Sequence, residues 1–490
     1  MPTTSDPVAK WRPAGRAEDR PDADPAHRHG RRVGTCRGGA RSRPALVALL
    51  PVVVLLASCG TRLPDKAFTT TTTPGSTPST TGSVVANPAS DTGVSADEIK
   101  VGVVVSLTGP LGAEAFSGPM YGALAYFEGL NARGGINGRR VTAVVCDDGS
   151  SGSGNQRCVQ DLIERDQVFA FAGNSIFTYA GAGYVNDKGV PDIGGQPIGH
   201  EYDQYPLLYS IYGSSAPREG TVGFDGKLYG GTEVYRYFRT KLKTKVAAVV
   251  AYNQSDSLRF ADYTEKGLRR EGYDVVREQV DFGVPNWDAA VIDMKARGVD
   301  IVFDALENTG NVNLCRAMDR NGLDVRAKVM SVQSWTDTVR SQYSDSPTCR
   351  KSLYATANDL NYADTQHHAV ARFRKDMART YPEREEQISM WAVEGWASAQ
   401  WFTDAAESCG ADLTRACLEA YMGRPDPYDG HGLLTPRGFV VSTDPEAPTR
   451  NCLNVARWQD AAQGGRGGWV TQTPNMDDTC FLVPSIAYAP

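Results

Sequence analysis

The chain has 490 residues, with 51 Lys and Arg against 57 Asp and Glu and a formal net charge of −6. Its basic residues are scattered and form no basic stripe, so we expect no nucleic-acid partner. The part of the chain after Gly60 contains no apolar run long enough to span a membrane. From Ser95 onward it is too long for one hydrophobic core, which predicts two lobes.

An apolar run over residues 45–56 follows an arginine-rich stretch and ends at Ala57-Ser58-Cys59. This layout is typical of a signal peptide, because a spanning helix needs about 20 apolar residues and tolerates Pro51 poorly. Leu56-Ala57-Ser58-Cys59 resembles the lipobox of bacterial lipoproteins, whose cysteine becomes the lipid-bearing first residue of the mature chain. We therefore expect residues 1–59 to be a signal peptide with a lipobox. Cys59 would carry palmitate-type acyl chains and anchor the protein on the extracytoplasmic face of the cell membrane.

The sequence on either side of this signal has no pattern of a folded domain. Residues 1–44 are rich in Arg, Pro, Asp and Ala and have few large apolar side chains, so they cannot form a core. We expect the true start to lie further downstream, with Val33 as one possibility. Residues 60–94 contain the Thr, Ser and Pro-rich stretches 69–74 and 76–83, a composition that predicts a flexible stalk.

From Ile99 onward, short β-branched runs alternate with amphipathic helical patterns, which is typical of βαβ units. The first series predicts strands at 99–105, 141–145, 168–172 and 190–193 and helices at 119–131 and 156–165. The second series predicts helices at 218–241, 260–271, 287–297 and 312–321 and strands at 246–251, 275–280, 301–303 and 327–331. A helical stretch at 369–420 and strands near 439–441 and 452–458 complete the pattern.

These two series predict an α/β protein with two doubly wound parallel-sheet lobes joined by a multi-crossing hinge. We assign residues 95–217 and 358–433 to lobe one, and residues 218–357 and 434–490 to lobe two. Ligands of open α/β sheets bind outside the carboxyl ends of the strands, so the loops after the strands are the candidate site. Trp391, Trp396 and Trp401 recur at turn-like spacing, and we interpret them as core residues rather than ligand contacts.

Ten cysteines are present, of which Cys36 precedes the cleavage site and Cys59 would carry lipid, leaving eight in the exported body. An even number in an exported chain indicates four disulfides, although the sequence leaves their pairing open. We favour pairing of neighbours because each pair would lie within one local unit: Cys146 with Cys158, Cys315 with Cys349, Cys409 with Cys417, and Cys452 with Cys480. There is no C-x-x-C spacing or histidine cluster for a metal, and we interpret His367 and His368 as solvated.

Residues 99–110 and 131–139, followed by Asp147-Asp148, resemble the opening of the branched-chain amino-acid (Leu/Ile/Val-binding) periplasmic solute-binding proteins of ABC importers. The resemblance continues through residues 189–191, 300–303 and 318–323. It implies the type I periplasmic-binding architecture, with three hinge crossings and a ligand closed between the lobes. It also implies a protein without catalytic residues or cofactor, in which Cys146 and Cys158 fall near a lobe-one disulfide of some members.

The resemblance also suggests ligand contacts in lobe one. The family loop that hydrogen-bonds a ligand carboxylate matches residues 174–178, which makes Asn174, Ser175 and Thr178 candidates. Hydroxyl and backbone N–H groups at a helix start can hold an anion, although these residues could equally only cap the helix. Gln196 and Ile198 occupy the second contact loop, where the family has small or hydroxyl residues. Glu114 or Phe116 replaces the aromatic residue after the first strand.

In lobe two, a tyrosine of the family aligns with Asp256 or Ser257, and a second aromatic residue aligns with Glu307. The acidic residue that pairs with the ligand ammonium aligns with Gln333, flanked by Trp335, and Gln333 has no charge for that bond. Glu307 or Asp256 could supply the charge, although both could equally be solvated loop residues. An amino acid therefore remains possible, and a neutral amide or a polyol competes with it.

We therefore expect a monomeric, lipid-anchored receptor that binds a small polar solute, amino acid or amide-like, and delivers it to ABC permease subunits. A sensing receptor of the same fold without transport is the alternative. A secreted α/β hydrolase is a third possibility, but there is no G-x-S-x-G elbow, P-loop or H-E-x-x-H motif. Asp147 and Asp148 follow a strand and precede Gly149, so we interpret them as turn-capping residues rather than a catalytic pair.

Overall fold

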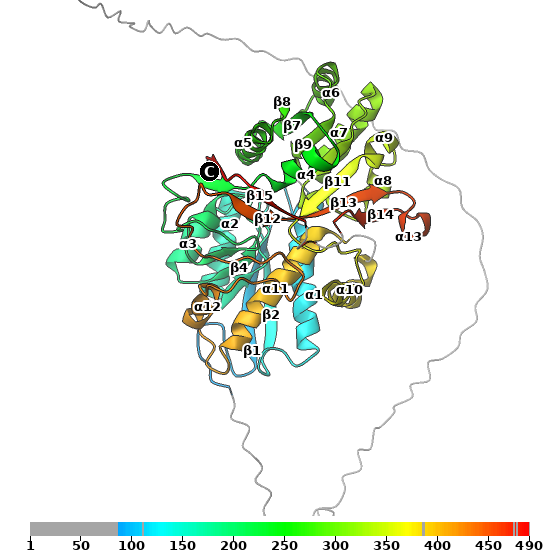
Figure 1. The fold of residues 1–490 in the computed structure, drawn as a ribbon. Coiled ribbons are helices and arrows are strands. Elements are labelled where there is room, and N and C mark those ends of the chain that lie inside the picture. Colours follow the sequence, from blue (N-terminus) through cyan, green and yellow to red (C-terminus); the bar gives the residue numbers. More distant parts are fainter. Residues whose placement is uncertain (1–86, 110–111, 385–387, 474–475, 477–478, 490) are drawn as a thin grey trace, which may run out of the picture. The chain divides into compact units, whose positions relative to one another are not determined.

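The computed structural model describes residues 87–109, 112–384, 388–473, 476 and 479–489 (Figure 1). The predicted signal peptide, Cys59 and residues 60–86 of the predicted stalk lie outside the described residues. Gly82–Pro490 is one compact unit. In the part of the chain that the structure describes, no helix combines the length and the apolar character that a membrane crossing requires.

The first sheet has five parallel strands in the order β2-β1-β3-β4-β5. We call this sheet and the helices packed on it lobe one. Its strands are β1 (Glu98–Val105), β2 (Arg140–Asp147), β3 (Ala170–Ala172), β4 (Asp192–Gly195) and β5 (Leu208–Ser210). Its helices are α1 (Ser117–Asn131), α2 (Gly152–Gln160), α3 (Ala182–Asp187), α10 (His368–Thr380), α11 (Met390–Ser408) and α12 (Arg415–Met422), with a π-helical turn at Asp161–Arg165.

The second sheet has seven strands in the order β14-β13-β11-β10-β9-β7-β8, and we call it with its helices lobe two. Its parallel strands are β7 (Val246–Tyr252), β8 (Asp274–Val280), β9 (Ile301–Ala305), β10 (Ala327–Met330) and β11 (Leu353–Ala357); β13 (Asn454–Gln459) and β14 (Gly468–Thr471) are antiparallel. Its helices are α4 (Glu233–Lys241), α5 (Ser255–Arg270), α6 (Trp287–Ala296), α7 (Asn308–Asn321), α8 (Val339–Gln342), α9 (Pro347–Lys351) and α13 (Ala462–Gly465).

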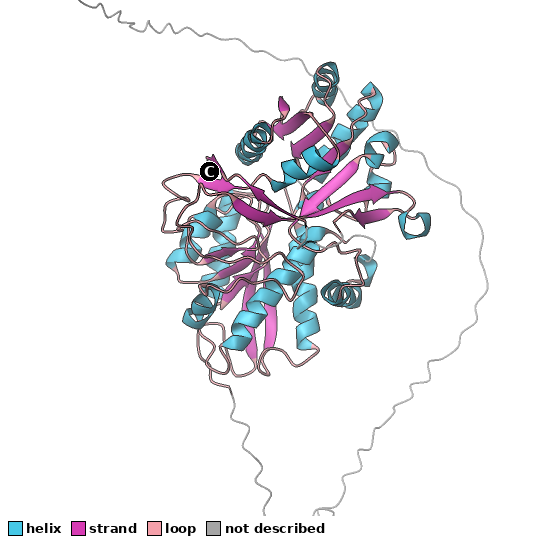
Figure 2. Ribbon diagram, viewed as in Figure 1, coloured by secondary structure: helices cyan, strands magenta, loops and turns pink. Residues whose placement is uncertain are grey.

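Two antiparallel pairs complete the described strands: β12 (Thr449–Cys452) with β15 (Cys480–Val483), and β16 (Ile486–Tyr488) with β6 (Leu228–Gly230). Short 3-10 turns lie at Ala113–Ala115, Glu201–Asp203, Val332–Ser334 and Pro382–Arg384. Figure 2 shows strands at the centre of each lobe and helices around them. The structure therefore confirms the predicted α/β class with two mainly parallel sheets.

Helix α11 belongs to lobe one although it follows lobe two in the sequence, and it lies beside α1 (Figure 1). Two glycines allow this close approach. A Cβ atom at Gly122 would lie 1.9 Å from the carbonyl oxygen of Ala392, and one at Gly395 would lie 2.0 Å from that of Pro119. Because α11 is buried along most of its length, its side chains form the centre of the lobe-one core.

Three chain segments connect the two lobes and are held together by one buried side chain. The Arg437 guanidinium donates to the carbonyl oxygens of Ile211 at 2.6 Å and Asn358 at 2.7 Å, and to the Asp359 carboxylate at 3.1 Å. The backbone N–H of Ser214 also donates to the carbonyl of Gly438 at 3.0 Å. The segments around residues 211–214, 358–359 and 434–438 therefore lie side by side.

Several element boundaries differ from the sequence prediction for reasons that the backbone explains. The helix predicted over 218–241 forms only from Glu233, because Arg218, Gly220, Gly223, Asp225 and Gly226 have positive φ angles that a helix cannot accommodate. No strand forms at 439–441, where the chain follows an irregular path beside Ser214 and Ser215. Helix α5 begins at Ser255, five residues earlier than predicted, because the Gln254 side chain accepts from the Ser257 N–H and caps it.

The end of the predicted stalk packs on the folded body. Val94 is buried in the lobe-one core, and the Ser90 hydroxyl donates to the Leu413 carbonyl at 2.6 Å. The Asp91 carboxylate accepts from the N–H of Arg415 at 2.8 Å. Ordered structure therefore begins before Ser95.

All four disulfides join the neighbours that we favoured, which confirms the predicted pairing. They are Cys146–Cys158, Cys315–Cys349, Cys409–Cys417 and Cys452–Cys480. Each bridge links residues at most 34 positions apart and lies within one lobe or within the β12–β15 strand pair. The disulfides therefore stiffen local units and leave the three crossings free to move.

The contact between α1 and α11 gives a stability prediction. We expect Gly122→Ala to lower the free energy of unfolding by about 1–3 kcal/mol, because the added methyl group forces the two helices apart. Urea denaturation would measure the change. Gly438→Ala is the control, since a Cβ atom there meets nothing within 4 Å. An unchanged midpoint for Gly122→Ala would contradict the close packing.

Candidate functional site

A cavity of about 260 Å³ lies between the lobes, at the carboxyl ends of strands from both sheets. Its lobe-one wall comes from the start of α1, the loops after β3, β4 and β5, and the start of α11. Three strand ends contribute to its lobe-two wall: the end of β7, the end of β9 and the loop after β10. The first turns of α5, the loop after β8 and the start of α7 complete this wall. The lining residues are Phe116, Phe177, Gln196, Pro197, Ile198, Tyr212, Tyr252, Gln254, Asp256, Ser257, Arg259, Phe260, Phe282, Asp304, Ala305, Leu306, Glu307, Ser331, Val332, Gln333 and Trp391.

Much of the wall is aromatic and already packed in place. Phe116 contacts Phe177 with ring centres 6.0 Å apart and Trp391 at 5.7 Å. On the opposite side, the Tyr252 and Phe282 rings meet edge to face at 5.2 Å. These pairs form a preorganised apolar surface on each lobe, which favours a solute with an apolar part.

Two carboxylates of lobe two retain capacity for a ligand. Glu307 caps α7 by accepting from the Gly310 N–H at 2.8 Å, and it also accepts from the Tyr252 hydroxyl at 3.3 Å. Burial raises the pKa of Glu307, and these two hydrogen bonds lower it only partly. Asp256 accepts from the Gln254 side chain at 2.9 Å. Because a carboxylate has about four acceptor positions, both groups can accept further donors.

Asp304 also lines the cavity, but its oxygens are already occupied. Its carboxylate pairs with the fully buried Lys328 ammonium and accepts from the Asn311 side chain at 3.1 Å and from the Leu306 N–H at 3.1 Å. Burial lowers the pKa of Lys328, and its pairing with Asp304 opposes that shift. A buried pair of this kind stays together because separating it would leave a charge without a partner. We therefore regard Asp304 as structural.

Two donors at the cavity wall lack a partner in the described part of the chain. They are the buried Nε of Arg259 and the buried indole N–H of Trp391. Arg259 is the cationic side chain among the described residues that line this cavity, and its terminal nitrogen donates to the Ile198 carbonyl. Buried donors without acceptors are costly, so an acceptor on a bound solute would satisfy them.

Two hydrogen bonds connect the lobes at the cavity. One is the bond from Arg259 on α5 to the Ile198 carbonyl in the loop after β4. The other runs from the Gln333 side chain to the Ala115 carbonyl at 2.6 Å. Each bond joins a lobe-two side chain to a lobe-one backbone oxygen, so both bonds can form only when the two lobes are close together.

The structure brings many of the predicted ligand-binding residues together in this cavity. Those that line it are Phe116, Gln196, Ile198, Asp256, Ser257, Glu307 and Gln333. Glu114 is exposed and lines a separate cavity of about 30 Å³ with Ser117 and Tyr121. The Ser257 hydroxyl donates to the Ala305 carbonyl at 2.7 Å and accepts from the Tyr252 N–H, so it positions the wall.

The remaining predicted contacts lie away from the described lining of the cavity. Asn174 is buried and its amide oxygen accepts from the Val104 N–H at 2.7 Å, and the Ser175 N–H donates to the Val104 carbonyl at 3.0 Å. Thr178 is half-buried and no helix starts there, since α3 begins at Ala182. Trp335 is fully buried and packs on Trp469 at 5.6 Å. The expected anion-binding loop is therefore tied to the sheet by its own backbone.

Sequence reasoning missed several lining residues, chiefly Tyr212, Tyr252, Arg259, Phe260 and Trp391. Trp391 was interpreted as a core residue, and it is only 5% exposed, yet it also borders the cavity. Arg259 and Phe260 lie in the first turns of α5, whose start was placed too late. The polar run from Gln254 to Ser257 is a helix-start signal that could have located them.

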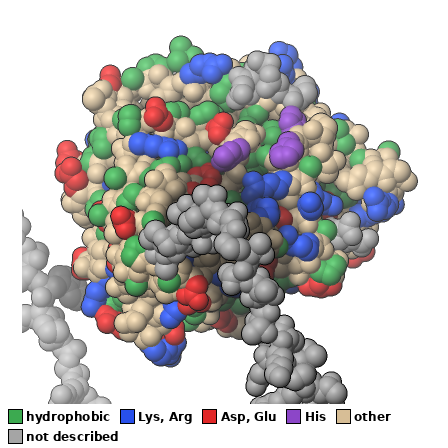
Figure 3. All heavy atoms as spheres, turned by 90° about the horizontal axis from the view of Figure 1, so that it is seen from below, with side chains coloured by type: hydrophobic (Ala, Val, Ile, Leu, Met, Phe, Trp, Pro, Cys, Tyr) green, Lys and Arg blue, Asp and Glu red, His purple; other side chains and the backbone are tan. Residues whose placement is uncertain are grey.

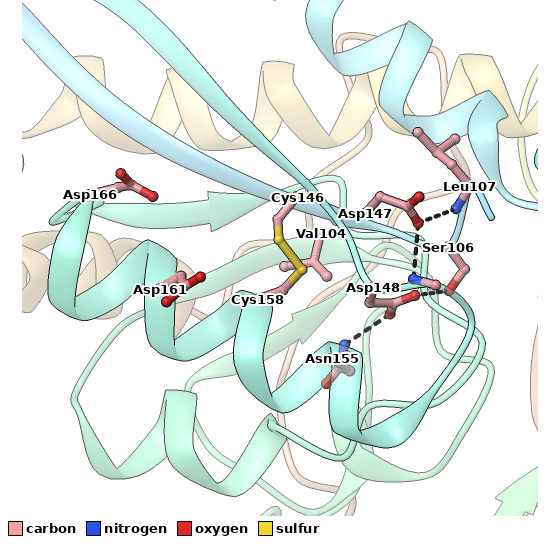
Figure 4. Close-up of a disulfide and its surroundings, with 12 residues drawn as sticks. Val104, Ser106, Leu107, Cys146, Asp147, Asp148, Asn155, Cys158, Asp161 and Asp166 are labelled. Carbon is pink, nitrogen blue, oxygen red and sulfur yellow. Dashed lines mark hydrogen bonds between the residues drawn. A yellow bond between two sulfur atoms is a disulfide. The ribbon is translucent and has the colours of Figure 1, made fainter. Parts of the chain in front are cut away.

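The paired acids Asp147 and Asp148 organise the turn after β1 (Figure 4). The Asp147 carboxylate accepts from the Leu107 N–H at 3.0 Å and the Thr108 hydroxyl at 2.8 Å. Asp148 accepts from the Ser106 hydroxyl at 2.7 Å and from the Asn155 side chain at 3.2 Å. The disulfide Cys146–Cys158 lies beside them. This confirms the interpretation of the two acids as turn-capping residues.

On the face seen in Figure 3, acidic and basic side chains are intermingled with apolar and neutral ones. Within the described ranges, no group of three or more His, Cys, Asp or Glu side chains is arranged to hold a metal ion.

A buried acid, Glu394 of α11, lies behind the cavity wall. It accepts from the Tyr212 hydroxyl at 3.0 Å and from the Gln196 side chain at 2.9 Å, and both partners line the cavity. Burial and the nearby Asp359 carboxylate raise the pKa of Glu394 well above its ordinary value of 4.5. The two hydrogen bonds lower the pKa but do not cancel this rise. Glu394 therefore links the cavity wall to the hinge segment that contains Asp359.

This raised pKa predicts a pH dependence. Between pH 4.5 and the higher pKa of the folded protein, the native state binds more protons than the unfolded chain, so stability falls as pH rises. Glu394→Gln removes this contribution, and we expect its free energy of unfolding to fall less steeply from pH 5 upward. Urea denaturation across that range would test it, with the exposed Glu383→Gln as the control. Parallel pH profiles for wild type and Glu394→Gln would contradict the assignment.

Comparison with known proteins identifies the family of this chain. Residues 98–465 match the family model described as periplasmic binding protein. An amino acid binding protein of Pseudomonas aeruginosa is 26% identical over 235 residues, which cover 46% of this chain and 59% of that protein. The aligned region thus spans about three fifths of the length of this curated relative.

Solved structures have the same fold at low sequence identity. A branched-chain amino acid transporter substrate-binding protein of Streptococcus pneumoniae, in complex with isoleucine, has a TM-score of 0.58 at 17% identity and covers 76% of this chain and 100% of that chain. A solute-binding protein of an ABC transporter from R. palustris, in complex with benzoate, has a TM-score of 0.59 at 14% identity, covering 79% and 97%. With two mainly parallel sheets, three connecting segments and a family match over most of its described length, this chain belongs to the periplasmic binding protein family, a non-enzymatic class with the type I fold.

Proposed function

We propose that the protein is an extracytoplasmic receptor that captures a small solute of the amino-acid type between its lobes and delivers it to an ABC permease. The observation that carries this proposal is the interlobe cavity, which combines an aromatic wall with unused groups of both charges. Relatives support it: the Pseudomonas aeruginosa protein is named for amino acid binding, and the Streptococcus pneumoniae structure holds isoleucine.

The lining suits a zwitterion. The unpartnered donors of Arg259 and Trp391 would bind a carboxylate, whereas Asp256 and Glu307 would bind an ammonium group. Charge-assisted hydrogen bonds of this kind are about twice as strong as neutral ones. The apolar surfaces of Phe116 and Tyr252 would contact the solute side chain. Gln333, which aligns with the usual acidic residue, serves the interlobe hydrogen bond instead.

The residues that we assign to the solute are Phe116, Gln196, Ile198, Tyr252, Asp256, Arg259, Glu307 and Trp391. Capture would follow the hinge mechanism of two-lobed receptors, in which the lobes close on the bound solute. We place the lobe boundaries near residues 217, 357 and 433, where the three segments joined by Arg437 pass between the sheets. The permease would recognise the closed form.

We also propose that the lipobox directs lipidation of Cys59, so that the receptor remains at the outer surface of the cell membrane. The apolar run of residues 45–56 and the sequence Leu56-Ala57-Ser58-Cys59 support this step. The Thr, Ser and Pro-rich residues that follow would space the binding body from the membrane. An anchored receptor keeps a captured solute close to its permease.

The solute can be identified by thermal-shift screening of amino acids, amides, polyamines and polyols. A ligand at 100 times its Kd raises the free energy of unfolding by about 2.7 kcal/mol. For an amino acid found this way, we expect Asp256→Asn or Glu307→Gln to weaken binding about tenfold or more, since each removes a charge-assisted hydrogen bond. Titration calorimetry would measure the change.

Glu383→Gln, an exposed change outside the cavity, is the control and should leave the affinity as it is. If an amide shifts the melting temperature while no amino acid does, the zwitterion assignment is wrong.

Uptake of the labelled solute by cells with and without the protein tests the transport step. Normal uptake in cells that lack it would argue against delivery to a permease.

Lipidation makes a separate prediction. In the native host, we expect the wild-type protein to partition into the detergent phase and its mature N-terminus to carry acyl chains on Cys59 by mass spectrometry. Cys59→Ala should move the protein to the aqueous phase without changing solute affinity, because the described lining of the cavity lies within residues 116–391. Detergent-phase behaviour that survives Cys59→Ala would exclude the lipid anchor.

A further inference from the structure

A second chamber adjoins the solute cavity and faces the hinge. It measures about 390 Å³, compared with about 260 Å³ for the first. Its wall comes mostly from lobe two, including α4, α5 and the ends of β9, β10 and β11, and it reaches hinge residue Asn358. The aromatic and aliphatic residues of the wall are Tyr212, Val234, Tyr235, Phe260, Tyr263, Phe303, Val329, Met330, Val332, Ala357 and Leu453.

The two chambers share part of their walls. Tyr212, Phe260, Asp304, Ser331 and Val332 line both of them. Phe260, on the second turn of α5, is 46% exposed, and its ring meets that of Tyr263 edge to face at 6.5 Å. An exposed aromatic side chain therefore borders both spaces.

Several polar groups of the second chamber already have partners within the protein. The Tyr235 hydroxyl donates to Thr264, and the Tyr263 hydroxyl donates to the Gly231 carbonyl. The Glu233 carboxylate accepts from the Asn451 side chain at 2.9 Å. Glu394 is bound by Tyr212 and Gln196, and Asp304 by Lys328. This chamber therefore offers apolar surface, and its described lining includes no Lys or Arg that could bind a carboxylate head group.

Among the described lining residues, a cation and carboxylates with unused acceptor positions occur together in the first chamber, whereas no Lys or Arg lines the second. Asp256, Arg259 and Glu307 line the first chamber and are absent from the described lining of the second. A charged head group would therefore bind in the first chamber, and an uncharged tail would occupy the second. The separation of charge and apolar surface sets the orientation of the solute.

We infer that the natural solute is an amphipathic amino-acid-type molecule whose apolar tail is longer than a branched-chain side chain and extends past Phe260 into the second chamber. This inference rests on the proposed function, since it takes the head group to bind in the first chamber. It narrows the substrate class from small polar solutes to those with a medium-length apolar tail.

Two alanines provide a matched test. Ala305 ends β9 and lines only the first chamber, whereas Ala357 ends β11 and lines only the second. Both are half-buried at the carboxyl end of a strand in the same sheet. Replacing either by Leu adds the same bulk to one chamber and leaves the other as it was. Thr356→Leu, which also fills the second chamber only, repeats the test at a second position.

The probes are straight-chain α-amino acids from norvaline to 2-aminodecanoic acid, measured by titration calorimetry on the whole exported protein. For wild type we expect the affinity to rise about fourfold per added methylene, as each one leaves water for the second chamber. Ala357→Leu and Thr356→Leu should leave norvaline binding within twofold of wild type and remove the gain for the longer members. Ala305→Leu should weaken binding of every member.

The outcomes separate this inference from the proposed function. If norvaline binds and Ala305→Leu weakens it, but affinity does not depend on chain length, the second chamber plays no part and the receptor function stands. A length dependence that Ala357→Leu and Thr356→Leu leave unchanged also overturns the inference. A parallel series of straight-chain carboxylic acids shows whether the ammonium group is needed. If neither series binds while another amino acid of the thermal-shift screen does, this inference fails and the proposed function stands.

Discussion

The arrangement of the two lobes depends on one buried guanidinium. Arg437 donates to the Ile211 and Asn358 carbonyls and to Asp359, so three segments far apart in the sequence run side by side. A planar fork of five donors can satisfy oxygens on several segments at once, which a shorter donor cannot. This clamp brings the strand ends of both sheets to the same cavity, and it places the hinge beside Glu394, which contacts the cavity wall.

The distribution of hydrogen bonds around the cavity separates structural from functional charges. Asp304 and Lys328 are both buried and satisfy each other, so they shape the end of β9 without contacting a solute. Asp256, Glu307 and Arg259 keep unused acceptors or donors at the wall. A buried polar group without a partner costs free energy, and a solute that supplies the partner recovers it. Such a cavity gains affinity from polar groups and specificity from their positions.

The sequence predicted best those features that depend on residues close together in the chain, and worst those that depend on distant residues. Many strands were located, because β-branched runs such as 246–251 are buried on both faces of a parallel sheet and need no distant information. Strands β5, β11 and β14 were missed. The disulfides were also paired correctly, since each joins neighbours in the chain. The helix predicted from Arg218 was wrong because positive φ angles at Gly220, Gly223 and Gly226 interrupt it. Placing the start of α5 too late hid Arg259 and Phe260 from the candidate site.

The sequence by itself predicted the class of the fold and its two-lobed organisation, because both depend on patterns within short stretches. It favoured the disulfide pairs but left them open, and the lipobox stays a prediction. Only the tertiary structure decided which side chains border the cavity. Trp391 could not be distinguished from Trp396 by spacing, yet one borders the cavity and the other packs wholly in the core. Whether a carboxylate such as Asp256 or Asp304 is free depends on partners brought from distant segments. Those contacts exist only in the folded protein, in which three segments pass between the two lobes.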